Sequence, residues 1–254
     1  MSFVKRFNPM NDMKRNVLLI LILIGSKAIF SQENAVKIGV LGAAIGDYSF
    51  GVEQVMHSDY SVNVNVGYWD LNAGLIDLHR FFTEGQDVWL QKGGAGWHGS
   101  IEMRTYFGLS QQAMNKRFYY GPYFRFWNNN MLFNDYINNE QVHQQLFAVD
   151  ATFKGLGVGL QLGYHLKLND KFWVDFYFIG LGAEHITMKA EYRVVGTQEF
   201  QYNFIENDVK GAFADKRSFI KKNLEVWSAA DALYIKLPVW LPGIRSGINL
   251  AYTF

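Results

Sequence analysis

Stretches in which apolar and polar residues alternate one by one recur along this chain, and they constrain its fold more than any other feature. Successive side chains of a β-strand point to opposite faces, so each stretch has one apolar face when it is extended. The opposite face mixes small, polar and aromatic residues. The five clearest stretches are residues 62–69, 100–107, 155–165, 172–179 and 247–254.

The alternation predicts eight strands, each close to the ~10 residues that a tilted strand needs to cross a bilayer. The first is the weakest, because Gly39, Gly42 and Gly46 interrupt it. The expected strands are residues 36–46, 48–57, 60–69, 97–108, 117–127, 152–166, 172–184 and 243–254.

The links between these strands differ in length in a regular way. Those after strands two, four and six are short, and those after strands three, five and seven are long. Outer-membrane barrels share this asymmetry, with tight periplasmic turns and long extracellular loops. The short link at Gly46-Asp47 is the exception. In the last long link we expect a helix around residues 215–227 and a hairpin above the membrane. The long links are residues 70–96, 128–151 and 185–242.

Residues 1–31 have the pattern of a secretory signal peptide. Basic residues precede an uninterrupted apolar run at 17–24, and small residues follow it. The run is too short to span a bilayer as a helix. A buried N-terminal helix is the alternative, which the all-round apolar character of the run disfavours. Met10 or Met13 could be the true start. We therefore divide the chain into a signal peptide, 1–31, and a barrel domain, 32–254.

The composition supports a membrane location for the second part. Charged residues make up 19% of the chain and aromatic residues 17%, whereas a soluble domain carries about 25% charge. No later segment approaches 18 continuous apolar residues, which excludes a transmembrane helix. Residues 32–254 hold 19 basic and 22 acidic side chains, which argues against nucleic-acid binding.

Lipid cannot satisfy backbone hydrogen-bonding groups, so a sheet in a membrane must close on itself. We therefore expect an all-β fold, an eight-stranded antiparallel up-and-down transmembrane β-barrel. A soluble barrel or sandwich is the alternative, and it would pack Leu160, Phe176 and Leu250 in a dry centre. Aromatic residues near the strand ends should form girdles at the two interfaces. These are Tyr48, Tyr68, Phe107, Phe118, Tyr164, Phe172 and Phe254.

The inner face of the predicted barrel collects charged residues. An eight-stranded barrel is just wide enough for side chains to fill, and isolated charges there would be costly, so they should pair. The network is either a structural plug or a narrow ion path. Gln161 and His165 share the inner phase. The predicted network consists of Glu53, Glu102, Arg104, Arg125 and Asp175.

His98, Ser100 and Glu102 lie on one face of a predicted strand, where a histidine could activate a serine. His98-Gly-Ser100 resembles the core of outer-membrane lipid A deacylases. The neighbouring residues of that motif are absent, and a deacylase needs its nucleophile facing lipid, whereas Glu102 is placed inward. The alternative is an interface histidine beside a small polar residue. We assign no catalytic residue.

No other motif points to chemistry. The remaining histidines fall in separate links, and no zinc, phosphate-loop or calcium-loop pattern occurs, so we expect no metal, nucleotide or other cofactor. The aromatic, Asn-rich segment at 127–139 is expected to be a loop tip, which binds a glycan or a partner protein, or nothing.

The last predicted strand ends on a C-terminal aromatic residue with three apolar residues in the same phase. This resembles the signal that outer-membrane barrels present to the barrel assembly machinery, with Phe254 as its anchor. The signal residues are Ile248, Leu250, Tyr252 and Phe254.

The chain resembles a family of eight-stranded outer-membrane barrels of unknown function from Gram-negative bacteria. The matching stretches spread over most of the chain, and the long link at 185–242 departs from the family pattern. The resemblance implies a fold and a location but no reaction. The stretches are residues 49–54, 101–107, 120–123, 157–164 and 247–252.

We expect a monomeric outer-membrane protein with a structural or adhesin-like role through its extracellular loops. A small channel and a lipid A-modifying enzyme are the alternatives. The expected partners are outer-membrane lipid, the assembly machinery, and a glycan or protein at the loops.

Overall fold

The computed structural model describes residues 34–57, 59–70, 92–107, 118–139, 143–196, 200–214 and 222–254. The predicted signal peptide, most of the first long link and the predicted short link at 109–116 lie outside the described residues.

The described residues form nine strands and two helices that have bounds in the structure. The elements are β1 (Asn34–Gly39), α2 (Val40–Ala44), β2 (Asp47–His57), β3 (Tyr60–Asp70), β4 (Lys92–Phe107), β5 (Phe118–Asn139), β6 (His143–Lys167), β7 (Phe172–Val194), α4 (Asn203–Ala214), β8 (Glu225–Ser228) and β9 (Leu233–Thr253).

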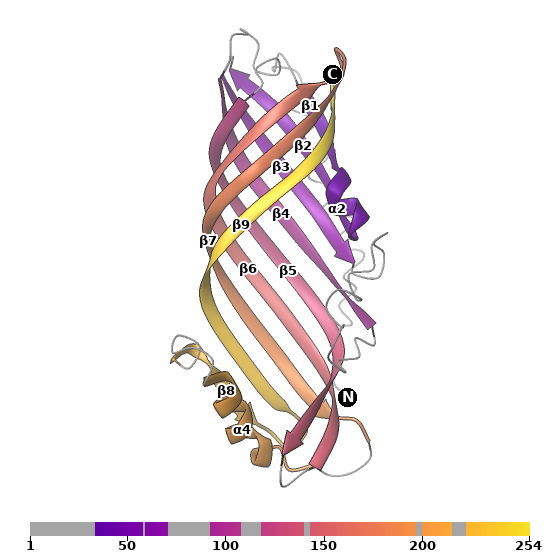
Figure 1. Cartoon of the computed structure of the whole chain (residues 1–254), viewed down its shortest axis with the longest axis vertical. Helices are drawn as coiled ribbons and strands as arrows, with labels where there is room; N and C mark the ends of the chain where they lie inside the picture. The colour runs from indigo at the N-terminus through magenta and orange to yellow at the C-terminus, as the bar shows by residue number, and fades with distance from the viewer. Residues whose placement is uncertain are drawn as a thin grey trace, which may run out of the picture.

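The strands form one antiparallel sheet in the order β1-β2-β3-β4-β5-β6-β7-β9-β8. β1 also pairs with β9, from Ala35 opposite Thr253 to Gly39 opposite Asn249. This pairing closes eight strands into a cylinder, with β8 added beside the N-terminal part of β9 (Figure 1). The predicted eight-stranded up-and-down barrel is therefore confirmed.

The first predicted strand is wrong in its second half. β1 ends at Gly39, and residues 40–44 form the short helix α2. Gly46 then returns the chain into β2 with a φ of 85°, which L side chains rarely adopt. Gly39 thus marks the strand end and Gly46 the turn, whereas Gly42 lies within α2.

Four strands continue far beyond the ends of their neighbours. β5, β6, β7 and β9 have 21 to 25 residues each, against 11 in β2 and β3. The expected loop at 128–151 is therefore mostly the outer half of a β5–β6 hairpin, and residues 127–139 belong to a strand. The link expected at 185–242 is likewise shorter than predicted, because β7 extends to Val194 and β9 begins at Leu233.

The helix expected around residues 215–227 is described only in its last part, where residues 222–223 are helical and residues 225–228 form a strand. α4 covers residues 203–214, and residues 215–221 lie outside the described part. Residues 225–228 form the strand β8 instead, because their alternating burial suits pairing with β9, from Glu225 opposite Lys236 to Ser228 opposite Leu233. β8 and β9 thus make an antiparallel hairpin in this link.

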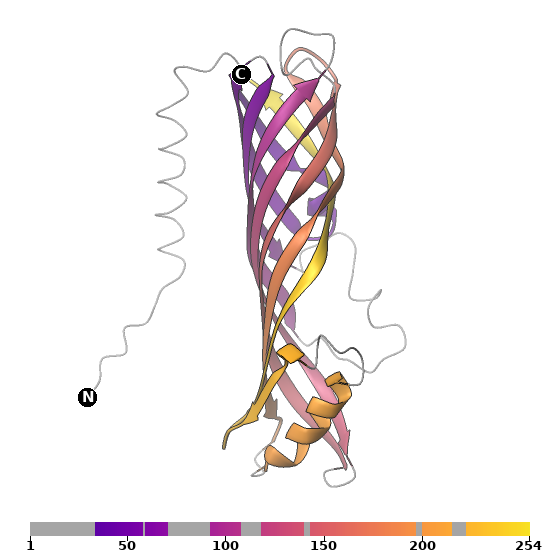
Figure 2. The same cartoon turned by 90° about the vertical axis from the view of Figure 1, so that its left-hand side faces the viewer.

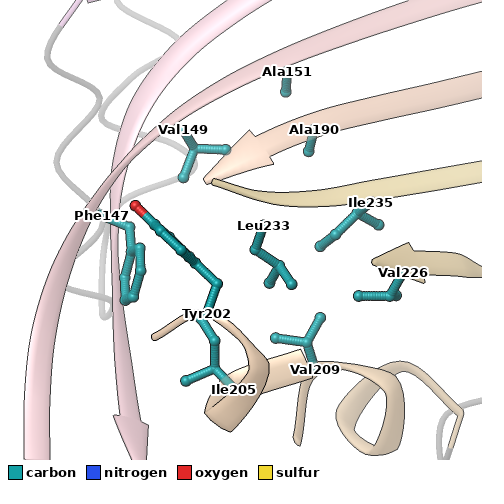
Figure 3. Packing of buried hydrophobic residues seen from close by; sticks show 10 residues of the cluster. All are labelled: Phe147, Val149, Ala151, Ala190, Tyr202, Ile205, Val209, Val226, Leu233 and Ile235. Carbon is teal, nitrogen blue, oxygen red and sulfur yellow. The ribbon is translucent and has the colours of Figure 1, made fainter. Parts of the chain in front are cut away.

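We call the part of the molecule beyond the barrel the extension. It consists of residues 128–139, 143–155, 186–194 and 233–239 of the four long strands, together with α4 and β8. Figure 2 shows α4 lying beside the continuing strands. In Figure 3, side chains of the α4 segment point toward those of the sheet. The buried cluster between them is Phe147, Val149, Ala151, Ala190, Tyr202, Ile205, Val209, Val226, Leu233 and Ile235.

The barrel has the opposite distribution of polarity. Leu160 is 66% exposed on its outside, whereas Glu102 and Asp175 are 1% and 0% exposed inside. Phe176 and Leu250 also lie in the outward phase. This arrangement excludes the soluble alternative with an apolar centre. In the described part of the chain, no helix has the length and apolarity that crossing a membrane requires.

Two aromatic belts border the apolar outer band. At the end with the short turns, Phe118 contacts Phe107 and Tyr164, with ring centroids 5.6 and 4.8 Å away. At the other end Tyr68 contacts Trp97 at 5.0 Å. The belts are eight residues apart on β3 and β5, about 26 Å along a strand at about 3.3 Å per residue. Tyr60, Phe107, Phe118, Tyr164, Phe172 and Tyr252 form the turn-side belt, and Tyr48, Tyr68, Trp97, Phe126 and Trp240 the extension-side belt.

Candidate functional site

Six charged side chains meet inside the barrel and form what we call the plug. They come from five strands, β1, β2, β4, β7 and β9, because each occupies an inward position of its strand. Three are cations and three are carboxylates, so the formal charges balance. The plug consists of Lys37, Glu53, Glu102, Arg104, Asp175 and Arg245.

Arg104 lies at the centre of the plug and pairs with all three carboxylates. Its guanidinium nitrogens lie 2.6 Å from Glu102, 3.0 Å from Asp175 and 3.1 Å from Glu53. Lys37 pairs with Asp175 at 2.8 Å and with Glu53. Arg245 pairs with Glu102 at 2.6 Å. Each charge therefore has a partner of opposite sign, as burial requires.

Neutral polar groups satisfy the remaining carboxylate oxygens. Glu102 accepts hydrogen bonds of 2.9 Å from the side-chain amides of Asn63 and Gln161. The hydroxyl of Tyr119 donates to Asp175 at 2.7 Å. Ser61 and Tyr106 both donate to Glu53. His165, also in the predicted inner phase, lies 3.4 Å from Asp175.

Solvent does not reach five of the six side chains of the plug, and Arg245 is 11% exposed. The side chains of Lys37, Glu53, Glu102, Arg104 and Asp175 are at most 1% exposed. Large neighbours complete the filling, since Arg104 stacks over the Tyr119 ring at 4.3 Å. Gly163 makes room for Tyr119, because a Cβ at Gly163 would overlap that ring. The lumen is closed at this level.

Arg125, which we predicted to join this network, lies elsewhere. It pairs with Glu184 nearer the extension and is 23% exposed. The register explains the pairing, because Arg125 and Glu184 both lie opposite Gly157 on β6. A Cβ at Gly157 would come within 2.9 Å of the Glu184 side chain and 3.3 Å of Arg125, so the glycine lets the two meet.

Lys37, Glu184 and Arg245 also face the lumen, although they were not part of the predicted network. Lys37 alternates with apolar neighbours in β1, and Arg245 shares the phase of Asn249, so the period of two could have found both. Glu184 could not be found in this way. A bulge after Tyr177 shifts the register of β7 and turns the even-numbered residues inward.

A polar cavity of about 560 Å³ lies in the lumen on the extension side of the plug. His98 and Ser100 line it, so the histidine faces the lumen and not the lipid interface, which corrects the interface interpretation. His98 pairs with Asp47 at 2.6 Å, whereas Ser100 lies 3.3 Å from both Asn65 and Glu102. A serine in this position does not face lipid, as a deacylase nucleophile must.

The described residues contain no group of three or more His, Cys, Asp or Glu side chains that could hold a metal ion. The terminal strand β9 pairs with β1, with Tyr252 opposite Val36. Ile248, Leu250 and Tyr252 alternate with the inward Asn249 and Ala251, and Phe254 is 61% exposed. The terminal residues are therefore placed beside the seam that closes the barrel.

Comparison with known proteins adds the following. No curated protein sequence matches the chain. The N-terminal β-barrel domain of Pseudomonas aeruginosa OprF is 10% identical, with a TM-score of 0.30, over 88% of this chain and 98% of that one. A major outer membrane protein from Thermus thermophilus is 14% identical, with a TM-score of 0.39, over 87% and 99%.

A family model described as a protein of unknown function, DUF3575, matches residues 17–213. This match covers more than half of the chain and includes β1 to β7 and nearly all of α4. The protein, a closed barrel with an apolar outside and a charged lumen, thus belongs to the DUF3575 family.

Proposed function

We propose that this protein is an outer-membrane anchor that holds a folded extension at the cell surface for contact with a partner molecule. The observation that carries the proposal is the extension itself. It has its own buried cluster, in which side chains of α4 pack with residues of β6, β7, β8 and β9. An anchor that only filled the bilayer would need strands no longer than β2 and β3.

The filled lumen supports an anchor rather than a channel. Side chains exposed by at most 1% close the barrel between the two belts. An eight-stranded barrel of this kind is a packed object and not a pore. In planar bilayers we expect purified protein to give no discrete conductance steps, and steady opening events would favour the small channel instead.

The apolar band supports a bilayer location. Leu156, Leu160 and Ile244 are more than half exposed on the outside of the barrel, which is the opposite of a soluble surface. Fractionation of cells tests the location. Recovery in the detergent-extracted outer-membrane fraction is expected, and recovery in the periplasm without detergent would contradict the proposal.

We propose that residues 1–31 are the export signal and that Ile248, Leu250, Tyr252 and Phe254 guide barrel assembly. The orientation follows from these assignments, with the N- and C-terminal ends of the barrel domain's chain in the periplasm and the extension outside. The chain has no cysteine, so single cysteines can report this orientation. Asn207 on α4 is exposed, and Asp170 in the short turn between β6 and β7 is 98% exposed.

In intact cells, a membrane-impermeant maleimide should label Asn207→Cys and leave Asp170→Cys unlabelled until the cells are permeabilised. The reverse pattern would place the extension in the periplasm and overturn the surface role.

The surface partner that we propose is a glycan or a protein, contacted by the extension. One feature of its outer face supports this choice. A hollow of about 310 Å³ lies between Leu132, which is 43% exposed, and the charged residues Asp150, Glu191 and Arg193. We expect cells that display the chain to bind host or neighbouring-cell glycans on an array. Binding that persists after Leu132→Ala and Arg193→Ala would exclude this face.

We also propose that the protein has no enzymatic activity. The observation in favour is that Ser100 is buried in the lumen, bonded to Glu102 and Asn65. Radiolabelled lipid A incubated with the purified barrel should release no acyl chain, whereas release that depends on Ser100 would reverse this proposal.

A further inference from the structure

Three lysines lie side by side on the outer face of the long strands, just beyond the extension-side belt. Lys154 is on β6, Lys189 on β7 and Lys236 on β9. The register places Lys189 directly opposite Lys236, and it places Lys154 opposite Thr187, two residues from Lys189. All three are in the outward phase of their strands, so they form one row across three adjacent strands.

The protein neutralises only part of the positive charge of this row. Lys236 bonds both carboxylate oxygens of Glu225 at 3.0 Å. Lys154 and Lys189 are exposed and have no acidic partner in the part of the chain that the structure describes. The row therefore carries a net charge of about two. Like charges directly opposite each other in a sheet are destabilising, so an external anion would stabilise the arrangement.

Two acidic residues lie one step farther from the barrel. Asp150 and Glu191 are opposite each other, and Glu191 pairs with Arg193. The order of polarity away from the barrel is thus apolar, then basic, then acidic. The basic row is confined to the level next to the apolar band.

Lys154 lies at the level of the headgroup region of a bilayer, and Lys189 and Lys236 lie just beyond its outer edge, from which a flexible lysine side chain can reach it. Leu156, His185 and Trp240 share one register row and mark the end of the apolar band. Lys154 lies two residues beyond this row, and Lys189 and Lys236 lie four residues beyond it. At about 3.3 Å per residue and a strand tilt of about 40°, these steps are about 5 and 10 Å along the barrel axis. The headgroup region of one leaflet is roughly 5–8 Å thick.

The surface below the row is hollowed. A depression of about 400 Å³ is lined by Phe126, Asn128, Lys154, His185 and Thr187, among others. His185 packs against Trp240 with ring centroids 5.2 Å apart. Aromatic rings, an amide and a cation at an interface suit a lipid whose headgroup is a phosphorylated sugar.

We propose that Lys154, Lys189 and the adjoining hollow bind a phosphorylated lipid headgroup of the leaflet that faces the extension. The lysine ammonium groups pair with the phosphate oxygens, and the aromatic residues contact the upper acyl chains. The inference rests on the proposed membrane location of the apolar band. It goes beyond the anchor role, because it gives the barrel a preferred lipid.

The test is a titration of the folded full chain, in maltoside micelles, with diphosphoryl lipid A, followed by native mass spectrometry. Monophosphoryl lipid A and the fully dephosphorylated lipid are the comparison ligands. The variant is Lys154→Gln with Lys189→Gln. The matched control is Lys167→Gln with Lys171→Gln, which removes two exposed lysines at the opposite end of the barrel.

We expect the variant to bind diphosphoryl lipid A about 30-fold more weakly than the unchanged protein. Each lysine near a charged membrane surface contributes about five-fold to the affinity, and the variant lacks two of them. The control should bind within about two-fold, and affinity should fall as phosphates are removed. Equal binding by variant and control, or no preference for phosphate in the unchanged protein, would overturn the inference. Binding in micelles does not depend on orientation, which the maleimide experiment tests separately.

Discussion

The barrel and the extension are built on the same four strands, yet they distribute polarity in opposite ways. On β6, Leu156, Val158 and Leu160 point outward in the barrel, and Lys154 and Asp150 occupy the same face in the extension. The inward face changes in the same place. Gln161 and Gly157 face the lumen, whereas Ala151, Val149 and Phe147 are buried under α4.

The reversal occurs along one register row of neighbouring strands. One register row contains Phe126, Leu156, His185 and Trp240, and beyond it most outward residues are polar. Backbone pairing continues through the change without a break on β5, β6 and β9. The comparison shows that the same strand geometry forms in both surroundings. Only the polarity of the outward side chains differs, according to whether the segment meets lipid or water.

The largest change in stability is expected when the centre of the plug is removed. Arg104→Met leaves three buried carboxylates with too few partners, and we expect a loss of roughly 3–5 kcal/mol in the free energy of unfolding. Urea unfolding in detergent, followed by tryptophan fluorescence, measures it. Arg125→Met is the control, because that pair is partly exposed and has one carboxylate. Similar midpoints for both variants would show that the plug is not the stabilising centre.

The second test attacks the apolar cluster of the extension. Leu233 is fully buried there, and Leu233→Ala should cost between roughly 2 and 5 kcal/mol locally. Hydrogen exchange should speed up in α4 and β8 and stay unchanged in β2 and β3. Leu181→Ala, at a residue 61% exposed on the barrel, is the control, since lipid fills the space of the lost side chain. Exchange that rises equally in both regions would mean that they unfold as one unit.

The third test places the same charge on one strand face in the two environments. Leu160→Lys on the barrel should destabilise the folded state in lipid by roughly 2–4 kcal/mol. Thr152→Lys, eight residues away on the same face of β6, should destabilise it by less than about 1 kcal/mol, because that position meets water and only the opposite Lys189 repels the new charge. Unfolding in phosphatidylcholine vesicles measures both. A loss at Thr152 as large as that at Leu160 would move the membrane boundary into the extension.

The smallest test concerns the join between α4 and β8. Glu206 accepts hydrogen bonds from Lys210 at 2.5 Å and from the Ser228 hydroxyl at 2.8 Å. The bond from Lys210 lowers the pKa of Glu206 below its usual value of 4.5. The stabilisation is therefore complete above that usual pKa and is lost as the pH falls through the lower value of the folded protein.

Glu206→Gln should accordingly destabilise α4 by less than about 1 kcal/mol at neutral pH, and the difference from the unchanged protein should vanish in acid. Protease susceptibility of the α4 segment against pH measures it. A difference that grows in acid would contradict the assigned sign.

Much of the barrel could be predicted because lipid imposes a simple rule. Outward residues such as Leu160 and Leu162 must be apolar, so a period of two locates the strands. The polar phase of the same strands predicted that Glu102, Arg104 and Asp175 face the lumen. The structure brings them together with Glu53. Arg125 shares that phase but lies at another height, and phase alone carries no information on height.

The extension could not be predicted in the same way. The strands of the extension also alternate, but their apolar side faces a helix and their outward side is polar. A polar, Asn-rich sequence such as residues 128–139 was therefore predicted to be a loop. α4 at residues 203–214 was not predicted, because its buried side chains pack in a cluster with residues of the distant strands β6, β7, β8 and β9. The local pattern around residues 203–214 does not reveal that surface.

The sequence by itself determined that this chain forms eight membrane-type strands with a charged interior, because alternation is a local property that follows from backbone geometry. The tertiary structure alone decided which charges meet. The β7 bulge turns Glu184 inward, Gly157 lets it reach Arg125, and β1–β9 closure brings Lys37 to Asp175. These outcomes depend on register and height between strands, which are set by the pairing of the whole sheet.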